Sequence, residues 1–145
     1  MANYYLIVTT PKDYLLDVKN GFQCAGFPYR NRAAVNQMCP GDKIIYYVTK
    51  VSKFCASVEV TGDAYTSRTQ IWDDPYDLWE YRIPTQPLSY VKSYMEGVYI
   101  KDIWDNLNMI KNKGKWGSQL MGSYRLLTEN DYNVIMNALN GEKTK

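Results

Sequence analysis

The chain contains no histidine, and this absence restricts the chemistry open to it. Histidine is the commonest general base and the commonest metal ligand near neutral pH. The three cysteines, Cys24, Cys39 and Cys55, have no CxxC spacing, so without histidine they form no recognisable zinc set. Nucleophilic catalysis also lacks its usual signatures, since neither a GxSxG nor a Ser-x-x-Lys pattern is present. We therefore expect a protein without metal or cofactor that is not an enzyme.

Long apolar runs and phosphate-binding loops are absent as well. The segment MANYYLIVTTPKD has an apolar run too short for a secretory signal and lacks a basic start. No stretch reaches the length of a membrane span, so we expect no membrane partner. The glycines match neither Walker A nor GxGxxG. An odd number of cysteines without a signal indicates free thiols and a cytoplasmic location.

What is present in quantity is aromatic: 14 tyrosines and 4 tryptophans in 145 residues. This length favours a single domain over residues 1–145, in which 141–145 are expected to form a frayed tail. The net charge is only +2, but acids are missing from 18–41 and from 106–128. They gather instead at Asp73, Asp74, Asp77 and Glu80, which we interpret as a solvated acidic loop. The charge distribution therefore indicates a local basic face.

Hydrophobic periodicity predicts an α+β fold with a mainly antiparallel, barrel-like sheet. In 53–60 apolar and polar residues alternate, which indicates a sheet with one wet face. Thr10 is the predicted N-cap of a first helix, and Thr128 caps a last helix with Asp131 at its third position. Strands are predicted at 4–9, 22–25, 43–49, 53–60, 80–83, 88–91 and 122–127, and helices at 11–19, 32–38, 103–110 and after 128.

Two basic segments are the best candidates for function. Arg30 and Arg32 follow a Gly-Phe-Pro turn, and the segment IKNKGKWG contains three alternating lysines and Trp116. Arginine and lysine neutralise phosphates, while aromatic faces stack on bases. Basic turns are also common on ordinary protein surfaces, so this pattern alone favours nucleic-acid binding only modestly.

Four segments in order give the chain a resemblance to a known family: YYLIVTTPKD, the GFP turn, PGDKIIYYVT and MIKNKGKWGSQLMGSYRLLTENDYNVI. In this set the chain resembles an EVE domain of the PUA-like superfamily, which also contains YTH domains. The resemblance implies an open β-barrel of mainly antiparallel strands flanked by short helices. It also implies a non-catalytic pocket for one flipped-out base, often a modified one, of RNA or DNA.

The resemblance further implies a set of site residues. Many relatives place a stacking tryptophan where this chain has Ala25, so Phe27 or Tyr29 is a candidate replacement wall. Trp72 is the preferred candidate for the second wall and Trp79 the next. The implied base pocket comprises Thr9, Thr10, Ala25, Gly26, Phe27, Tyr29, Tyr47 and Trp72. Tyr47 alternates with Tyr46 along its strand, so only one of the two can face the pocket. The implied phosphate contacts are Arg30, Arg32, Lys111, Lys113 and Lys115, with Trp116 as packing that supports the pocket.

We therefore expect a nucleic-acid-binding module that recognises a single, modified base in a pocket. Two alternatives remain open. The same cavity could hold a small aromatic or zwitterionic metabolite, in which case salt would barely affect binding. The chain could also be an interaction module accessory to a nucleic-acid enzyme, with the acidic loop 73–80 as its contact.

Overall fold

One mixed sheet of eight strands organises the protein. A computed structural model describes residues 2–111, 113–114, 116 and 124–143. The main strand order is β2-β6-β4-β3-β1-β8, with β5 beside β6 and β7 beside β4. The strands are β1 (Tyr4–Thr9), β2 (Cys24–Phe27), β3 (Lys43–Val48), β4 (Lys53–Val60), β5 (Tyr65–Thr66), β6 (Tyr81–Tyr90), β7 (Val98–Tyr99) and β8 (Tyr124–Leu127). β1 and β3 are parallel, whereas the other pairs are antiparallel.

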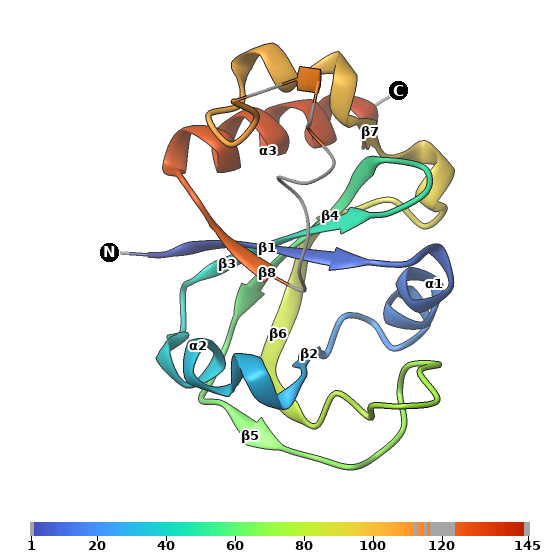
Figure 1. Cartoon of the computed structure of the whole chain (residues 1–145), viewed down its shortest axis with the longest axis vertical. Helices are drawn as coiled ribbons and strands as arrows, with labels where there is room; N and C mark the ends of the chain where they lie inside the picture. The colour runs from blue at the N-terminus through green and yellow to red at the C-terminus, as the bar shows by residue number, and fades with distance from the viewer. Residues whose placement is uncertain (1, 112, 115, 117–123, 144–145) are drawn as a thin grey trace.

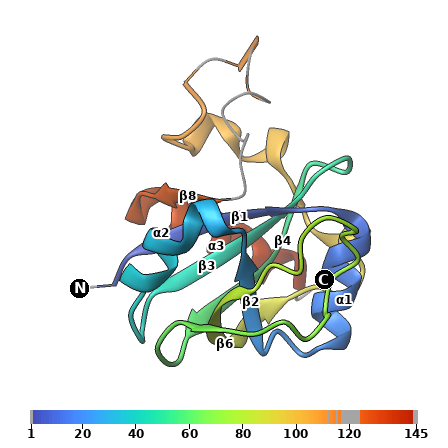
Figure 2. The same ribbon diagram turned by 60° about the horizontal axis from the view of Figure 1, so that its bottom comes forward.

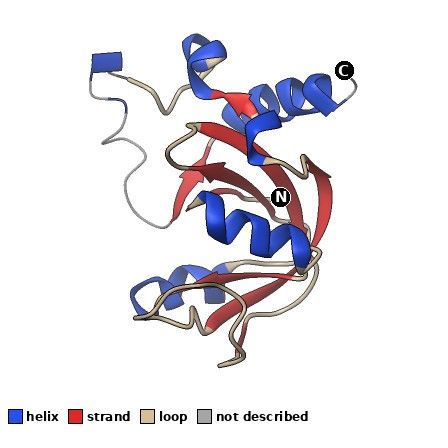
Figure 3. Cartoon of the chain, turned by 90° about the vertical axis from the view of Figure 1, so that its right-hand side faces the viewer, coloured by secondary structure: helices blue, strands red, loops and turns tan. Residues whose placement is uncertain are grey.

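The sheet curls into a half-barrel with helices around it (Figures 1 and 3). The helices are α1 (Pro11–Lys19), α2 (Arg32–Gln37) and α3 (Glu129–Lys143), with short 3-10 turns at 29–31, 94–96, 100–102 and 104–106. α1 lies near the end of β1, and α3 lies at the other side of the sheet. Of the helices that the structure describes, none has the length and apolarity to cross a membrane. The expected α+β, mainly antiparallel open barrel is confirmed.

The start of α1 follows directly from the sequence. Thr10 Oγ1 accepts a hydrogen bond from the backbone N–H of Asp13 at 3.2 Å, and Pro11 occupies the first helical position. The helix ends at Asn20, after which Gly21 adopts a φ of 70°. Tyr14 is fully buried, and its hydroxyl donates to the carbonyls of Val91 and Cys55 at 2.6 and 3.0 Å. This bond holds α1 against the sheet.

The prediction that one face of β4 is exposed to solvent is wrong. Phe54 and Val58 are buried as expected, but Cys55 and Ser57 on the alternate positions are buried too. The reason is α3, which packs over this face and brings the Tyr132 hydroxyl to 3.4 Å from Ser57 Oγ. An alternating pattern predicts which face a strand prefers to bury, but not whether a helix covers the other face.

Several boundaries also differ from the predictions. The second strand is Cys24–Phe27 rather than 22–25, because Phe22 has a φ of 53° and packs its ring against Tyr46 and Tyr90. The two short strands predicted at 80–83 and 88–91 are one strand, β6. Instead of a helix at 103–110 there are only 3-10 turns. α3 continues to Lys143, so 141–143 are helical and not part of an irregular tail.

The cap of α3 combines a confirmed and a corrected feature. Thr128 Oγ1 accepts from the backbone N–H of Asp131 at 3.1 Å, as predicted. The Asp131 carboxylate instead accepts from the backbone N–H groups of Asn108 and Met109, at 2.6 and 2.9 Å. Asp131 therefore ties the segment before residue 110 to the beginning of α3.

Candidate functional site

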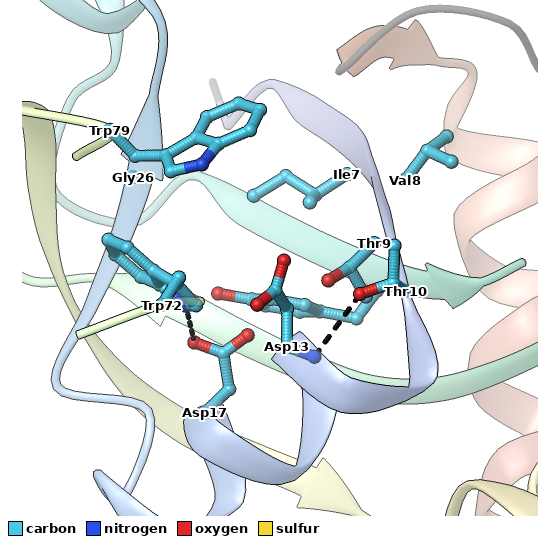
Figure 4. Close-up of a pocket in the computed structure, with 10 residues that line it drawn as sticks. Ile7, Val8, Thr9, Thr10, Asp13, Asp17, Gly26, Trp72 and Trp79 are labelled. Atoms are coloured by element: carbon cyan, nitrogen blue, oxygen red, sulfur yellow. Dashed lines mark hydrogen bonds between the residues drawn. The ribbon is translucent and has the colours of Figure 1, made fainter. Parts of the chain in front are cut away.

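A cavity of about 160 Å³ opens between the end of β1, the first turns of α1, the strand β2 and the loop 67–80 (Figure 4). The two tryptophans lie on one side, the threonines on the opposite side, and two carboxylates lie between them. Its lining is Ile7, Val8, Thr9, Thr10, Asp13, Asp17, Gly26, Tyr46, Trp72 and Trp79. These residues come from four separate segments, so the cavity exists only in the folded protein.

The loop 67–80 passes beside α1 (Figure 2), and two hydrogen bonds join them. Trp72 Nε1 donates to Asp17 Oδ1 at 2.8 Å, and the backbone N–H of Asp73 donates to Asp13 Oδ1 at 3.1 Å. An exposed ion pair between Lys12 and Asp73 adds a third contact at the surface. Because Asp13 and Asp17 are four residues apart, they project from the same face of α1 toward the loop.

Gly26 allows Trp72 to lie directly against β2. A Cβ atom at this position would lie 2.4 and 2.5 Å from two ring carbons of Trp72, and 3.0 Å from Cβ of Trp79. Such approaches are far inside van der Waals contact, so any side chain at residue 26 would displace the indole. Glycine is required here for the close approach of the ring rather than for an unusual backbone angle.

Trp79 is held by hydrogen bonds within its own loop. Its Nε1 donates to Asp74 Oδ2 at 3.1 Å, and its backbone N–H donates to Asp77 Oδ1 at 2.7 Å. The residue has a φ of 54°, which is unusual for a side chain other than glycine. The acidic loop, which the sequence indicated as merely solvated, therefore uses two of its acids to orient an aromatic side chain of the pocket.

Arg82 binds the backbone of the loop 67–80. It is only 2% exposed, and its guanidinium donates to the carbonyls of Trp79 and Leu78 at 3.1 Å each and to that of Thr69. The same guanidinium lies 5.2 Å from the centre of the Trp72 ring. A buried arginine bonded to three carbonyls fixes the loop backbone, and the sequence pattern contained no sign of this role.

Two buried polar groups line the cavity. Asp17 is 2% exposed, and burial raises the pKa of its carboxyl to about 7; the charge of Asp13 adds to the shift, and the Trp72 hydrogen bond opposes it. The Tyr46 hydroxyl is fully buried and has no hydrogen-bond partner among the described residues. Burial, together with the charge of Asp17, raises the pKa of Tyr46 as well. Buried polar groups are normally paired, so the Tyr46 hydroxyl is an exception among the described residues.

Four of the eight predicted pocket residues line the cavity: Thr9, Thr10, Gly26 and Trp72. Tyr47 does not, because successive residues of β3 point to opposite faces of the sheet. It packs instead on Phe54, with ring centres 5.2 Å apart, and Tyr46 takes the place at the cavity. Ala25 and Phe27 are both 1% exposed and lie in the core, away from the lining.

Tyr29 is exposed and does not supply the missing wall. Its ring packs edge-on against Tyr81 at 5.7 Å, and the Arg32 guanidinium lies 3.7 Å from its centre. It borders a separate pocket of about 400 Å³ whose other residues are Arg68, Asp74, Pro75, Tyr76, Asp77, Leu78 and Glu80. The second aromatic side chain of the main cavity is Trp79. The sequence analysis named it as the next candidate after Trp72.

The predicted phosphate contacts divide into two groups. Arg30 and Arg32 are both at the surface directly after β2, within six residues of Gly26. Lys111 and Lys113 are exposed too, but Lys113 pairs with Asp105 and lies 5.6 Å from the Trp104 ring centre. Lys115 lies outside the described residues.

Trp116 contacts Trp104 and Lys101, which do not line the cavity. Its ring packs edge-on against Trp104 at 6.2 Å, with Lys101 Nζ 5.7 Å away. It is not among the described residues that line the cavity, and its role as packing that supports the pocket stays a prediction. In Figure 1 the segment 100–111 lies near α3, whereas α1 and β2, which border the cavity, lie farther down in the view.

Sequence reasoning missed Asp13 and Asp17 as cavity residues. The signal that could have identified them is their spacing, since two acids four residues apart on a short helix lie on one face. Among the described residues, no group of three or more His, Cys, Asp or Glu side chains could hold a metal ion.

Comparison with known proteins identifies the family of this chain. The family model for the EVE domain matches residues 3–138. The chain belongs to the EVE domain family. A UPF0310 protein of Pyrococcus abyssi is 28% identical over 149 residues, which cover 94% of this chain and 99% of that protein.

Solved structures show the same fold at lower identity. Human THYN1, in complex with DNA containing 5-methylcytosine, is 15% identical, with a TM-score of 0.56 and 99% of each chain covered. The Pho92 YTH domain, in complex with m6A, is 12% identical, with a TM-score of 0.67, covering 95% of this chain and 83% of the other. The EVE domain with its PUA-like fold, suggested by four sequence segments, is therefore confirmed.

Proposed function

We propose that this protein is a non-catalytic nucleic-acid-binding module that takes one modified base of RNA or DNA into the cavity beside α1. The observation that carries the proposal is a cavity of about 160 Å³ bordered by Trp72, Trp79 and Tyr46, which also presents polar groups to its interior. Apolar cavities of about 150 Å³ hold a benzene ring. The space thus suits one planar heterocycle that remains attached to a strand outside.

Two proteins of the same fold support this assignment by what they bind. Human THYN1 forms a complex with DNA containing 5-methylcytosine, and the Pho92 YTH domain forms one with m6A. In both cases the ligand is a methylated base. The families to which they belong act as binding modules, which favours recognition over catalysis for this chain too.

Stacking in the cavity can offset the free-energy cost of extruding a base from its strand. Extruding a base costs a few kcal/mol, and stacking on an aromatic side chain returns about 1–3 kcal/mol per base. Trp72 and Trp79 provide the aromatic surface. Thr10 already accepts from Asp13 as a cap, so Thr9 is the threonine that we assign to the base.

Phosphate contacts would come first from the arginines after β2. Arg30 and Arg32 follow Gly26 closely in the chain, and Arg32 can leave the Tyr29 ring to meet a phosphate. Lys111, Lys113 and Lys115 would contact a more distant part of the strand. Each phosphate neutralised releases counterions, so affinity should fall as salt rises.

The test is a binding panel of oligonucleotides that differ in one base, each measured at two salt concentrations. We expect at least one methylated base to bind more tightly than its unmodified counterpart, with affinity lower at the higher salt. Equal, weak binding of all oligonucleotides would refute the proposal. Salt-independent binding of a free nucleoside or another aromatic metabolite would favour a small-molecule pocket instead.

A further inference from the structure

The described residues that line the cavity include two carboxylates, Asp13 and Asp17, and no lysine or arginine. Asp13 and Asp17 lie on the side between the tryptophans and the threonines (Figure 4). The nearest buried cation is Arg82, but it is bonded to three backbone carbonyls of the loop and faces the Trp72 ring. Lys12 is engaged with Asp73 at the surface. The ionisable carboxyl groups in the described lining therefore have no basic side chain beside them in the cavity.

Asp17 is the unusual member of this set. It is almost fully buried, yet the only hydrogen bond that the structure gives its carboxylate comes from a neutral indole, Trp72 Nε1. A buried carboxylate is normally paired with a cation, because leaving it unpaired carries a large desolvation penalty. The Tyr46 hydroxyl, buried in the same wall, has no partner among the described residues either. Both groups lack what a positively charged, N–H-bearing ligand would supply.

The aromatic walls favour the same ligand. A cation near a tryptophan face is attracted by the ring quadrupole, and tryptophan is the strongest such partner among the aromatic residues. Trp72 and Trp79 both border the cavity that contains the carboxylates. A neutral base would gain stacking alone, whereas a charged base would gain stacking, cation–π attraction and a counter-ion.

On these grounds we propose that the cavity selects a nucleobase that carries a positive charge through methylation of a ring nitrogen, with its exocyclic N–H donating to Asp17. This inference rests on the proposed function and narrows it to one class of base. 1-Methyladenine and 3-methylcytosine carry such a charge at neutral pH. Each has a neutral isomer, N6-methyladenine and 5-methylcytosine, that bears the same methyl group at another position.

The isomers make the test direct. The full chain is titrated at pH 7 and one ionic strength with four oligonucleotides of one sequence, which contain 1-methyladenine, N6-methyladenine, 3-methylcytosine or 5-methylcytosine. We expect the charged isomer of each pair to bind about tenfold more tightly or better, which corresponds to about 1.4 kcal/mol. Equal binding, or tighter binding of the neutral isomers, would overturn the inference.

Two variants locate the effect. Asp17→Asn keeps an oxygen for Trp72 but removes the charge, so the ratio of the affinities for the charged and neutral isomers should fall to about one. Asp63→Asn removes the same charge from an exposed residue outside the cavity and should retain the preference. If Asp17→Asn keeps the preference as well, Asp17 is not the counter-ion and the inference fails.

Failure of the inference is distinguishable from failure of the proposed function. If a neutral methylated base binds more tightly than the unmodified base and the charged one does not, the proposed function stands and the inference falls. If no methylated oligonucleotide exceeds the unmodified one, the proposed function falls. Binding of free 1-methyladenosine, with no added affinity from an oligonucleotide, would support the cation pocket but contradict the nucleic-acid role.

Discussion

Two regions of this protein place tryptophans beside charged residues, and they differ in what surrounds the rings. Around the cavity, Trp72 and Trp79 each donate an indole N–H to a carboxylate, and a space of about 160 Å³ opens between them and α1. In the segment before β8, Trp104 packs on Trp116 and is approached by Lys101 and Lys113.

The second region is the one whose composition looks like a nucleic-acid site, because it combines lysines with aromatic residues. Its tryptophan rings, however, pack against each other and lie close to lysine side chains. The first region looks acidic in sequence, yet its acids orient the aromatic walls of a cavity. Aromatic and basic residues together therefore indicate a surface, whereas a base pocket also needs space and rings fixed by hydrogen bonds.

The largest effect that separates the regions should come from Gly26. In Gly26→Val the new side chain would overlap the Trp72 ring, since even a Cβ lies 2.4 Å from it. We expect base-dependent binding to be lost, and the free energy of unfolding to fall by about 1–3 kcal/mol from overpacking. The measurement is oligonucleotide titration together with urea unfolding. Gly141→Ala is the control, since no atom lies within 4 Å of a Cβ there; loss of binding in that variant would speak against a steric cause.

Titration of Asp17 should produce the next largest effect. Its native pKa of about 7 lies above the ordinary 3.8, so the folded state binds this proton more tightly than the unfolded state does. The stability that follows is complete below about pH 4 and is lost as pH rises through about 7, by at most about 4 kcal/mol. The titratable or polar groups that face Asp17 are Asp13, Tyr14, Cys24, Tyr46 and Trp72.

Asp17→Asn is the variant that tests this titration. It should unfold at higher urea concentration than the native chain at pH 8.5, and at a similar concentration at pH 4. Urea unfolding at a series of pH values from 4 to 8.5 gives both curves. A native curve that is flat over this range, or that rises, would show that Asp17 does not titrate in this way.

The sequence predicted those structural features that depend on neighbouring residues in the chain. β1, α1 and β3 were predicted nearly at their observed bounds, because each has its own periodicity, cap or turn. The choice between Tyr46 and Tyr47 could not be made, since both belong to one apolar run and both are buried. A strand pattern defines which residues alternate but not which of them faces a cavity.

The polar contacts of the site could not be predicted, because they also join residues that are distant in the sequence. Asp17 meets Trp72 across 55 positions in the chain, and Arg82 reaches carbonyls of a loop that has no regular structure. No periodicity encodes such contacts. Gly26 and Trp72 were predicted only through the resemblance to a family, and their direct contact requires the folded backbone.

The two tryptophan regions can be compared with matched substitutions. Trp79→Ala should reduce affinity for a preferred modified base by about 1–3 kcal/mol, the value of one stacked ring. Trp104→Ala removes a similarly half-buried ring and should leave the ratio between modified and unmodified oligonucleotides unchanged. Fluorescence or anisotropy titration measures both ratios. An altered ratio in Trp104→Ala alone would move the base site to the lysine-rich segment and reverse the comparison drawn above.

The smallest effect should distinguish the basic residues of the two regions. Arg30→Gln should weaken binding of all oligonucleotides alike and lower the slope of log affinity against log salt by about one, the share of one phosphate contact. Lys113→Gln should change the slope less, because Lys113 is paired with Asp105 and must first exchange that carboxylate for a phosphate. Titrations at four or more salt concentrations give the slopes. A larger change for Lys113 than for Arg30 would mean that the strand runs along the lysine-rich segment, and that the cavity receives its base from that side.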